Sequence, residues 1–437
     1  MLFRLNRIML VIVGLLLAAS IVGNAMAADN HVDVLTVKGT INPVLVDYID
    51  RGIDQAEEGN AEALIIQMDT PGGLDTAMRD IIQSMVNSRV PVVVYVSPSG
   101  ARAASAGVFI TMAAHVAVMA PNTAIGAAHP VSGSGEDIPG AMEEKVVNDA
   151  AAYIRSIAEA HGRNMEWAEK AVRESVSATE QEALELNIID MVSPDLDALL
   201  QQIDGLAITM LDGREVILDT AGSAVNYNDM SLIEDFLYTI ADPNIAYLLM
   251  SLATMGIMVE IFNPGLIFPG VVGGISLLLA FYSLGVLPVN WAGVLLIVLA
   301  VGLFVAEVLT TTFGLFTAGG VVALVAGSLL LFQGASPVFQ INPWLIATVT
   351  IVITGAFAFV ISRALNAHRR QAKTGREELI GKKAVVKVAL NPEGMVFYKG
   401  ERWEAISDEG IIKPGEEVII KEIDGLTLRV SKKKEGG

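Results

Sequence analysis

The chain has 437 residues, enough for two or three domains, and a mean hydropathy of +0.53, which is too high for a protein without membrane spans. It contains no cysteine, which excludes disulfides, a thiol nucleophile and cysteine metal sites, and its five histidines show no metal-ligand spacing. The net charge of −19 argues against a nucleic-acid partner, because the phosphate backbone requires positive charge. We therefore expect a membrane protein with no metal, nucleotide or organic cofactor.

The first 27 residues have the pattern of a secretory signal peptide. Arg4 and Arg7 supply a positively charged start, an apolar run follows over 8–19, and residues 25–27 form an A-x-A cleavage site. The alternative interpretation is an anchor helix that is not cleaved. Both interpretations place the chain from Ala28 onward outside the cytoplasm.

Residues 28–205 alternate between short apolar runs and amphipathic stretches. The predicted strands are 32–37, 63–68, 90–96, 115–119 and 188–192. The predicted helices are 42–58, 75–88, 104–112, 142–161, 165–174 and 178–186. Such alternation predicts an α/β domain with a largely parallel sheet. A polar connector, 206–243, follows this domain and contains a hairpin turn at Asp212-Gly213.

Two loops that follow predicted strands carry the residue types of an acyl-transfer site. One loop belongs to the sequence MDTPGG, and the other to GARAASAG. Gly72 and Gly73 let backbone N–H groups approach closely, and with the N–H of Ala106 they can bind an oxyanion. Ser105 offers a hydroxyl at the start of a helix, where the helix dipole favours negative charge. We predict Ser105 as the nucleophile; the alternative is a serine that only caps the helix.

The stretch 244–365 is predicted to be a transmembrane region of four to five helices. It carries only three charged residues, Glu260, Glu307 and Arg363, and both glutamates lie near segment ends, where interfacial placement is favoured. It divides into the apolar segments 245–262, 268–287, 291–309, 313–333 and 343–362, most of them near the ~20 residues that cross a bilayer. The basic cluster at 368–383 belongs on the cytoplasmic side, so a chain that starts outside needs an odd number of spans. Five spans satisfy both conditions.

The last part of the chain, 366–437, is predicted to be a small all-β domain. Five short strands, 383–390, 395–398, 401–407, 417–423 and 427–430, are separated by turn sequences such as Pro414-Gly415 and Asp424-Gly425. This pattern favours a small barrel such as an OB-fold. Its few aromatic residues and interleaved acids favour a protein-interaction or membrane-adjacent module over a nucleic-acid groove.

The motifs MDTPGG and GARAASAG, followed by several spans and then by NPEGMVFYKGERWEA and IDGLTLRV, resemble the long-form NfeD family over nearly the whole chain. The resemblance implies a ClpP/crotonase-like N-terminal domain and an ATP-independent serine endopeptidase with a Ser–Lys dyad. On this resemblance the dyad serine is Ser105 and the dyad lysine is Lys145. It also implies a stomatin-like (SPFH) membrane protein as partner or substrate, with cleavage in or near hydrophobic segments.

The general base has two candidates. Lys145 is the one that the family resemblance supports, and it must be neutral to accept a proton, which burial would favour. His129 lies 24 positions after Ser105, close to the spacing of the ClpP triad histidine, so a triad of Ser105, His129 and Asp190 is the alternative. In the first case His129 shapes the pocket or contacts substrate. His115 is expected to be a buried structural residue.

The sequence therefore predicts a multi-pass cell-membrane endopeptidase that acts on a protein or peptide substrate. Its protease domain is expected outside the cytoplasm and its C-terminal domain inside. Because ClpP-like folds assemble through their helices, a homo-oligomer in contact with membrane lipid is also expected. The competing hypothesis is a membrane organiser or scaffold that keeps the ClpP-like fold without turnover and binds an SPFH protein.

Overall fold

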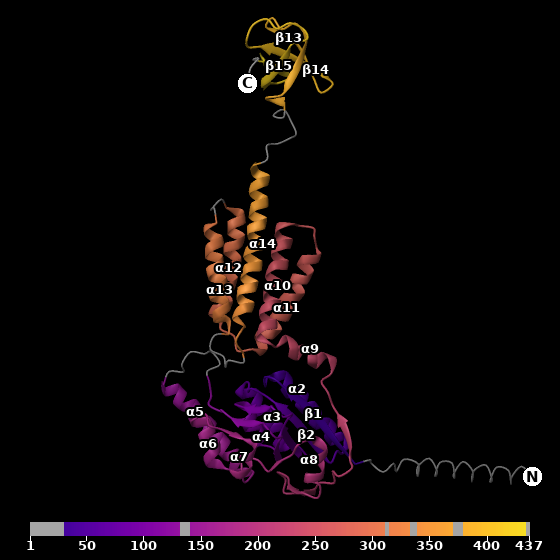
Figure 1. Cartoon of the computed structure of the whole chain (residues 1–437), viewed down its shortest axis with the longest axis vertical. Helices are drawn as coiled ribbons and strands as arrows, with labels where there is room; N and C mark the ends of the chain where they lie inside the picture. Colours follow the sequence, from indigo (N-terminus) through magenta and orange to yellow (C-terminus); the bar gives the residue numbers. More distant parts are fainter. Residues whose placement is uncertain (1–29, 132–139, 311–313, 333–338, 370–378, 434–437) are drawn as a thin grey trace, which may run out of the picture. The chain divides into compact units, whose positions relative to one another are not determined.

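The computed structural model describes residues 30–131, 140–310, 314–332, 339–369 and 379–433 (Figure 1). The predicted signal peptide, 1–27, lies outside these residues. The chain forms two compact units, of which the first ends at Thr354 and the second begins at Gly355. Each unit is described by itself.

A six-stranded parallel sheet forms the centre of the N-terminal domain. Its strands, in spatial order, are β11 (Ala224–Tyr227), β1 (His31–Lys38), β2 (Ala63–Asp69), β3 (Val92–Val96), β5 (Val116–Met119) and β8 (Met191–Val192). Every residue of β3 is buried, because a parallel sheet that is covered on both faces needs continuous apolar strands. The predicted parallel α/β domain is confirmed.

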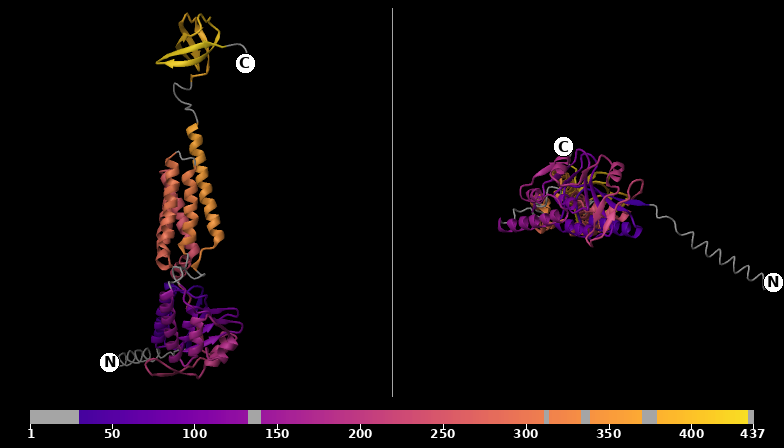
Figure 2. Two further views of the ribbon diagram at one scale, coloured as in Figure 1. Left: turned by 90° about the vertical axis from the view of Figure 1, so that its left-hand side faces the viewer. Right: turned by 90° about the horizontal axis from the view of Figure 1, so that it is seen from below.

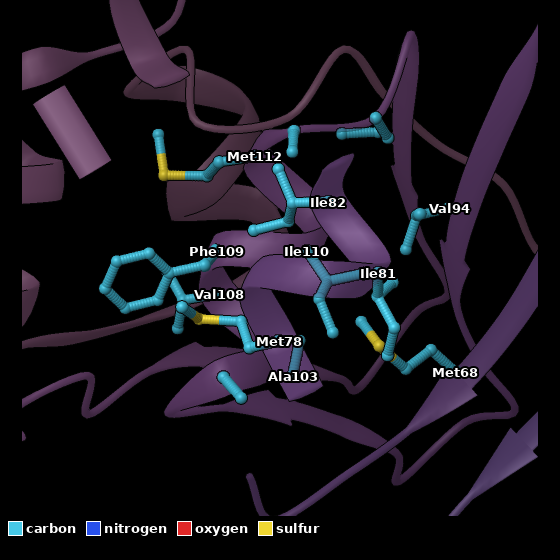
Figure 3. Packing of buried hydrophobic residues seen from close by; sticks show 14 of the residues in the cluster. Met68, Met78, Ile81, Ile82, Val94, Ala103, Val108, Phe109, Ile110 and Met112 are labelled. Carbon is cyan, nitrogen blue, oxygen red and sulfur yellow. The ribbon is translucent and has the colours of Figure 1, made fainter. Parts of the chain in front are cut away.

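Helices cover one face of this sheet. They are α2 (Pro43–Gly59), α3 (Asp75–Asn87), α4 (Ala106–Met112), α5 (Gly140–Ala160), α6 (Met165–Arg173) and α7 (Glu180–Glu185). The core between them and the sheet includes Met78 and Ile81 of α3, Phe109 of α4 and Val94 of β3 (Figure 3). The opposite face is covered by α8 (Leu196–Ile203) and the hairpin of β9 (Ala207–Thr209) and β10 (Glu215–Ile217).

The structure differs from the sequence prediction at several short strands. A second sheet contains β4 (Arg102–Ala104), β6 (Ala124–Gly126) and β7 (Ser177–Thr179), none of which was predicted. The predicted helices 104–112 and 178–186 therefore begin later, because their first residues extend into β4 and β7. The predicted connector 206–243 has the expected hairpin, but it also supplies β11, which pairs in parallel with β1. Three- and four-residue strands are too short to show an apolar period.

Five apolar helices follow in the order expected. They are α10 (Pro243–Phe262), α11 (Phe268–Val286), α12 (Trp291–Leu309), α13 (Leu315–Leu331) and α14 (Pro343–Arg369). The first three are long and apolar enough to cross a membrane, whereas α13 and the apolar part of α14 are shorter. The pairs α10–α11 and α12–α13 lie side by side as hairpins (Figures 1 and 2). A Cβ on Gly256 or Gly293 would lie within 2.6 Å of the neighbouring helix backbone, so glycine permits this close packing.

The two membrane-region glutamates lie two residues before the ends of their helices, as expected. Glu307 accepts hydrogen bonds from the backbone N–H groups of Gly314 (2.8 Å) and Thr317 (3.0 Å), at the start of α13. Glu260 accepts one from Gly265 (3.3 Å), in the turn before α11. In both hairpins a carboxylate therefore holds the turn between the helices.

The second unit contains a closed five-stranded barrel with its own apolar core. Its strands are β12 (Lys383–Val388), β13 (Glu393–Tyr398), β14 (Glu401–Ser407), β15 (Glu417–Asp424) and β16 (Thr427–Lys432). The spatial order is β12-β13-β14-β16-β15, with β14 and β16 parallel and the other neighbours antiparallel. This arrangement is consistent with the predicted OB-like barrel.

Candidate active site

Ser105 lies in a strained turn between β4 and α4. Its backbone has φ 53° and ψ −115°, a conformation that residues with side chains rarely adopt. Ser105 occupies the N-cap position of α4, but its hydroxyl makes no capping hydrogen bond to that helix. A strained strand-to-helix turn that exposes a serine hydroxyl is the geometry of a nucleophile elbow, although the G-x-S-x-G motif is absent.

Backbone hydrogen bonds between the two loops fix this turn. The N–H of Thr70 donates to Arg102 (2.8 Å), and the N–H of Ala104 donates to the carbonyl of Thr70 (3.0 Å). The N–H of Ser105 itself donates to Gly126 of β6 (3.1 Å). The two loops that the sequence analysis selected are therefore joined into one short bridge, and Ser105 stands at its end.

The three predicted oxyanion donors differ in whether their N–H groups are available. The N–H of Gly72 donates to the Thr70 hydroxyl (3.0 Å), so it is already occupied. Gly72 is instead needed for space, because it has φ +115° and a Cβ there would lie 2.6 Å from the Ser105 Cβ. Gly73 and Ala106 remain as candidate donors, since neither N–H has a hydrogen-bond partner among the described residues.

A cavity of about 410 Å³ opens beside Ser105. Four of the predicted site residues line it: Gly73, Ser105, Ala106 and Lys145. Its walls also include apolar side chains, among them Met78, Phe109 and Val146. The structure thus brings the two residues of the predicted dyad to one cavity, on which α3, α4 and α5 converge.

Lys145 lies in the second turn of α5 and is exposed. It forms no ion pair with any of the described residues. Burial, which the sequence analysis named as a means of keeping this lysine neutral, is therefore absent here. The lysine faces solvent at the edge of the cavity.

Arg79 is a cavity residue that the sequence analysis missed. From α3 its guanidinium pairs with Asp75 (2.9 Å) and with Asp149 of α5 (2.5 Å), and it lies 4.4 Å from the ring centre of Tyr153. Asp149 and Tyr153 come four and eight positions after Lys145, on the same side of α5. Arg79 therefore fastens the lysine-bearing helix to α3. Only the Asp75–Arg79 spacing was visible in the sequence, because Asp149 is 70 positions away.

The alternative triad is not assembled within the described part of the chain. The Nδ1–H of His129 donates to the carbonyl of Val172 (2.8 Å), and its Nε2 lies 3.9 Å from Glu143. Its neighbours Ala128 and Pro130 line the cavity, but His129 does not.

Asp190, the acid of that alternative, has a different role. It accepts hydrogen bonds from Arg163 (2.6 Å) and from the N–H of Ala117 (2.7 Å). Arg163 also donates to the carbonyls of Met112 (2.6 Å) and Ala114 (2.9 Å), at the end of α4. Asp190 thus supports the far end of the serine helix.

Two histidines lie beside this ion pair, in which Arg163 is buried and Asp190 reaches the surface. His115 accepts a hydrogen bond from the N–H of Val92 (3.1 Å), consistent with the structural role expected for it. Burial, and secondly the charge of Arg163, lower the pKa of His115 and lower that of His161 to about 4. Both rings are therefore neutral in the folded protein near neutral pH.

The strained Ser105 turn beside a cavity, on a chain with apolar helices of membrane-spanning length, fits a membrane-bound protease. Three family models match the chain: the NfeD1b N-terminal domain at 31–196, the NfeD integral membrane domain at 244–363 and the NfeD-like C-terminal, partner-binding domain at 376–432. The chain is 40% identical to the membrane-bound protease PH1510 of Pyrococcus horikoshii, over 99% of this chain and 100% of that protein. The protein belongs to the NfeD family.

Other relatives match as well. The membrane protein NfeD1b of Bacillus subtilis is 26% identical over 93% of this chain and 94% of its own length. A solved structure of the stomatin-specific protease 1510-N, a lysine-to-alanine mutant in complex with a substrate peptide, is 38% identical and covers 49% of this chain and 98% of that chain, with a TM-score of 0.46. The C-terminal domain 1510-C from Pyrococcus horikoshii is 46% identical and covers 14% of this chain and 98% of that one, with a TM-score of 0.14.

Proposed function

We propose that this membrane-bound protease is an ATP-independent serine endopeptidase that uses Ser105 as nucleophile and Lys145 as general base. The observation that carries the proposal is the strained Ser105 turn on the same cavity as Lys145. No residue of the rival triad other than Ser105 lines that cavity. The 40% identity to a membrane-bound protease, over 99% of this chain, supports peptide-bond hydrolysis as the reaction.

The mechanism that we propose follows from this placement. Neutral Lys145 accepts the Ser105 proton while the Ser105 oxygen attacks the peptide carbonyl. The N–H groups of Gly73 and Ala106 donate to the oxyanion that forms. Lys145 then gives its proton to the leaving amine. It later accepts a proton from the water that hydrolyses the acyl-enzyme and returns this proton to the departing Ser105 oxygen. The cycle consumes one water and needs no nucleotide.

Arg79 contributes to the proposed base through charge. Asp149 lies one helical turn after Lys145 and would hold the lysine in its charged form if the two were paired. Because Arg79 engages both Asp149 and Asp75, these carboxylates are compensated without the lysine. Arg79 therefore keeps these carboxylates from pairing with Lys145.

The proposed substrate is a hydrophobic segment of a stomatin-like (SPFH) membrane protein. The apolar walls of the cavity, formed by Met78, Phe109 and Val146, suit apolar side chains. The solved relative 1510-N is named a stomatin-specific protease, which agrees with this choice. We further propose that the protease domain lies outside the cytoplasm and that the chain crosses the membrane five times. The barrel then lies inside and binds the partner, and the enzyme works as a homo-oligomer.

A cleavage assay tests this function. The full chain in lipid vesicles is incubated, without ATP, with a peptide that covers a hydrophobic segment of a stomatin-like protein and with a polar peptide of equal length. Wild type should cleave the hydrophobic peptide faster, and Ser105→Ala should cleave neither. Equal cleavage by Ser105→Ala would refute the nucleophile. Binding of the stomatin-like protein without cleavage by wild type would favour the scaffold hypothesis.

A further inference from the structure

Helix α9 (Leu232–Ile240) connects the protease domain to the first membrane helix. It begins with a capping box between Ser231 and Glu234. Only Ala241 and Asp242 separate its last residue from Pro243, the first residue of α10. The carbonyl of Ile240 accepts a hydrogen bond from the hydroxyl of Ser283 in α11 (2.6 Å). The helix is therefore joined directly to the membrane hairpin.

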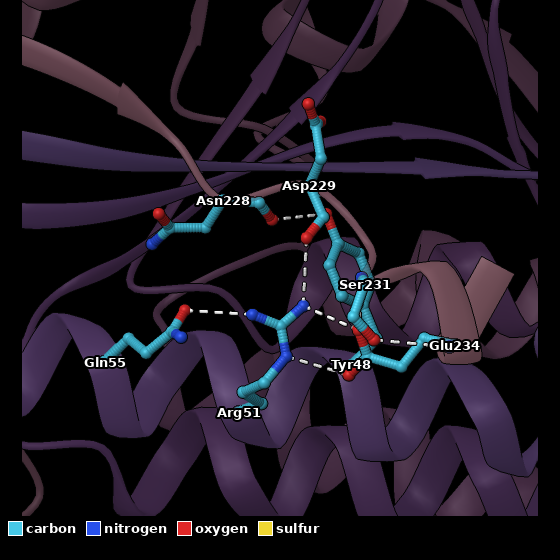
Figure 4. A network of polar contacts seen from close by, with 7 residues as sticks. All are labelled: Tyr48, Arg51, Gln55, Asn228, Asp229, Ser231 and Glu234. Carbon is cyan, nitrogen blue, oxygen red and sulfur yellow. Dashed lines mark hydrogen bonds and ion pairs between the residues drawn. The ribbon is translucent and has the colours of Figure 1, made fainter.

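One side of α9 is fastened to the protease domain. Arg51 of α2 donates two hydrogen bonds to the Glu234 carboxylate, both 2.8 Å long, and a third to the carbonyl of Asp229 (3.0 Å) (Figure 4). The hydroxyl of Tyr238 donates to the carbonyl of Lys38 (3.0 Å). Glu234 and Tyr238 are four positions apart, so the contacts of these two side chains lie on one face of the helix.

The other side of α9 exposes large apolar side chains. Leu232 is 91% exposed, Ile233 71% and Phe236 48%. At 100° per residue these three lie within about 100° of one another and point away from the Glu234 and Tyr238 face. The helix is thus amphipathic, with its polar contacts used by the protein and its apolar face uncovered.

The position of α9 in the chain identifies what covers this face. The starts of α10 and α14 are joined by a hydrogen bond from the N–H of Asn342 to the Asn244 side chain (2.8 Å), so they lie at the same end of the helices. Trp344 of α14 is 82% exposed at that end, and Trp291, the first residue of α12, is 72% exposed. Exposed tryptophans at helix ends mark the boundary between lipid and water. Since α9 leads directly into α10, it lies at this boundary.

We propose that α9 is an interfacial helix whose face of Leu232, Ile233 and Phe236 is immersed in the membrane surface, and that it holds the protease domain against the bilayer. Lipid therefore covers this apolar face. Such helices bury their apolar face about 5–10 Å into the boundary between headgroups and acyl chains. The Arg51–Glu234 ion pair then holds α2 at a fixed position relative to the membrane surface. This docking does not depend on which residues perform the proposed catalysis.

The absence of cysteine makes a direct depth measurement possible. Leu232→Cys and Phe236→Cys variants of the full chain carry a nitroxide label in phosphatidylcholine vesicles, and its collisions with oxygen and with a water-soluble nickel complex are compared. Val298→Cys, exposed on α12, is the control for lipid contact. Leu211→Cys, an equally apolar exposed residue in the β9–β10 hairpin, is the control for water contact.

The proposal predicts that the labels at 232 and 236 favour oxygen over the nickel complex, as the label at 298 does and the label at 211 does not. Access of the nickel complex equal to that at 211 would overturn it. Protection from both reagents, with dipolar coupling between labels that persists when lipid is added in excess, would also overturn it and would assign the face to a second copy of the chain. The label at 298 also reports whether the chain inserts into the vesicles under the conditions used for all four variants.

Discussion

The two sides of the cavity are built differently. On the serine side, backbone hydrogen bonds from Thr70, Ala104 and Ser105 fix a strained turn, and Arg163 binds carbonyls at the other end of α4. On the lysine side, α5 is held to α3 through the side chain of Arg79. A backbone framework places an atom more tightly than long side chains do, since each side chain must first lose rotamer freedom. The nucleophile is therefore expected to be fixed, and the base adjustable.

The largest effect on activity is expected at Gly72, where there is no space for a side chain beside Ser105. In Gly72→Ala the new Cβ would lie 2.6 Å from the Ser105 Cβ, on a backbone with φ +115°. Displacing the nucleophile by even an ångström should lower kcat/KM by about 10²-fold. Gly100→Ala is the matched control, because Gly100 also has positive φ but nothing lies within 4 Å of its Cβ position. Equal activity losses in the two variants, measured as peptide hydrolysis, would show that space at Gly72 is unimportant.

The protein should also lose stability in acid, through His161 beside the Arg163–Asp190 ion pair that supports α4. The pKa of His161 is about 4 in the folded protein against about 6.5 when unfolded, so the unfolded state binds the extra proton first. The free energy of unfolding should therefore fall as the pH drops from about 6.5 to 4, by about 2–3 kcal/mol. His161→Gln should flatten this dependence in denaturant titrations, whereas His129→Gln should not. An unchanged slope in His161→Gln would contradict this assignment.

On the lysine side, Arg79→Met should lower kcat about 10-fold, which is less than the ~10²–10⁴-fold contribution of a positioned proton acceptor, because Lys145 itself is kept. The freed Asp149 would pair with Lys145, one helical turn earlier in α5, and draw it away from Ser105. Arg89→Met is the control, because Arg89 pairs with Glu57 away from the cavity. An unchanged kcat in Arg79→Met would show that Arg79 does not position Lys145.

The smallest effect is expected at α9. Tyr238→Phe removes the hydrogen bonds to the carbonyls of Lys38 and Thr40, just before Ile41, whose backbone pairs with Gly73. The free energy of unfolding should fall by about 1 kcal/mol, with a loss of activity smaller than that in Arg79→Met. Tyr227→Phe, at an exposed tyrosine, is the control. A larger activity loss than in Arg79→Met would show that the site depends more on the attachment of α9 than on that of α5.

The sequence predicted what local patterns encode. The long buried strands and the amphipathic helices follow from the period of their apolar residues, and the structure contains them. The Gly-Gly and serine loops could be selected because glycine and small residues have few other uses directly after buried strands.

What the sequence did not predict depends on contacts between distant residues. The turn at Ser105 is fixed by hydrogen bonds to Thr70, and α5 is held by the ion pair between Arg79 and Asp149. Neither pair of positions is linked by a repeating pattern in the sequence. The hydrogen bond that occupies the Gly72 N–H also requires the folded loop, because in the sequence both glycines are equivalent donors. Strand β11 was missed because its four residues are too few to show an apolar period, and its partner residues in β1 lie 193 positions earlier in the chain (His31 pairs with Ala224).

The central claim is that Ser105 and Lys145 act together, and fluorophosphonate labelling tests it most directly. The full chain in vesicles is labelled across pH as wild type, Ser105→Ala, Lys145→Ala and His129→Ala, and the modified residue is identified by mass spectrometry. The account predicts that labelling falls on Ser105, is lost in Ser105→Ala, is strongly slowed in Lys145→Ala and is retained in His129→Ala. Labelling that survives loss of Lys145 but requires His129 would contradict it and assign the base to the histidine.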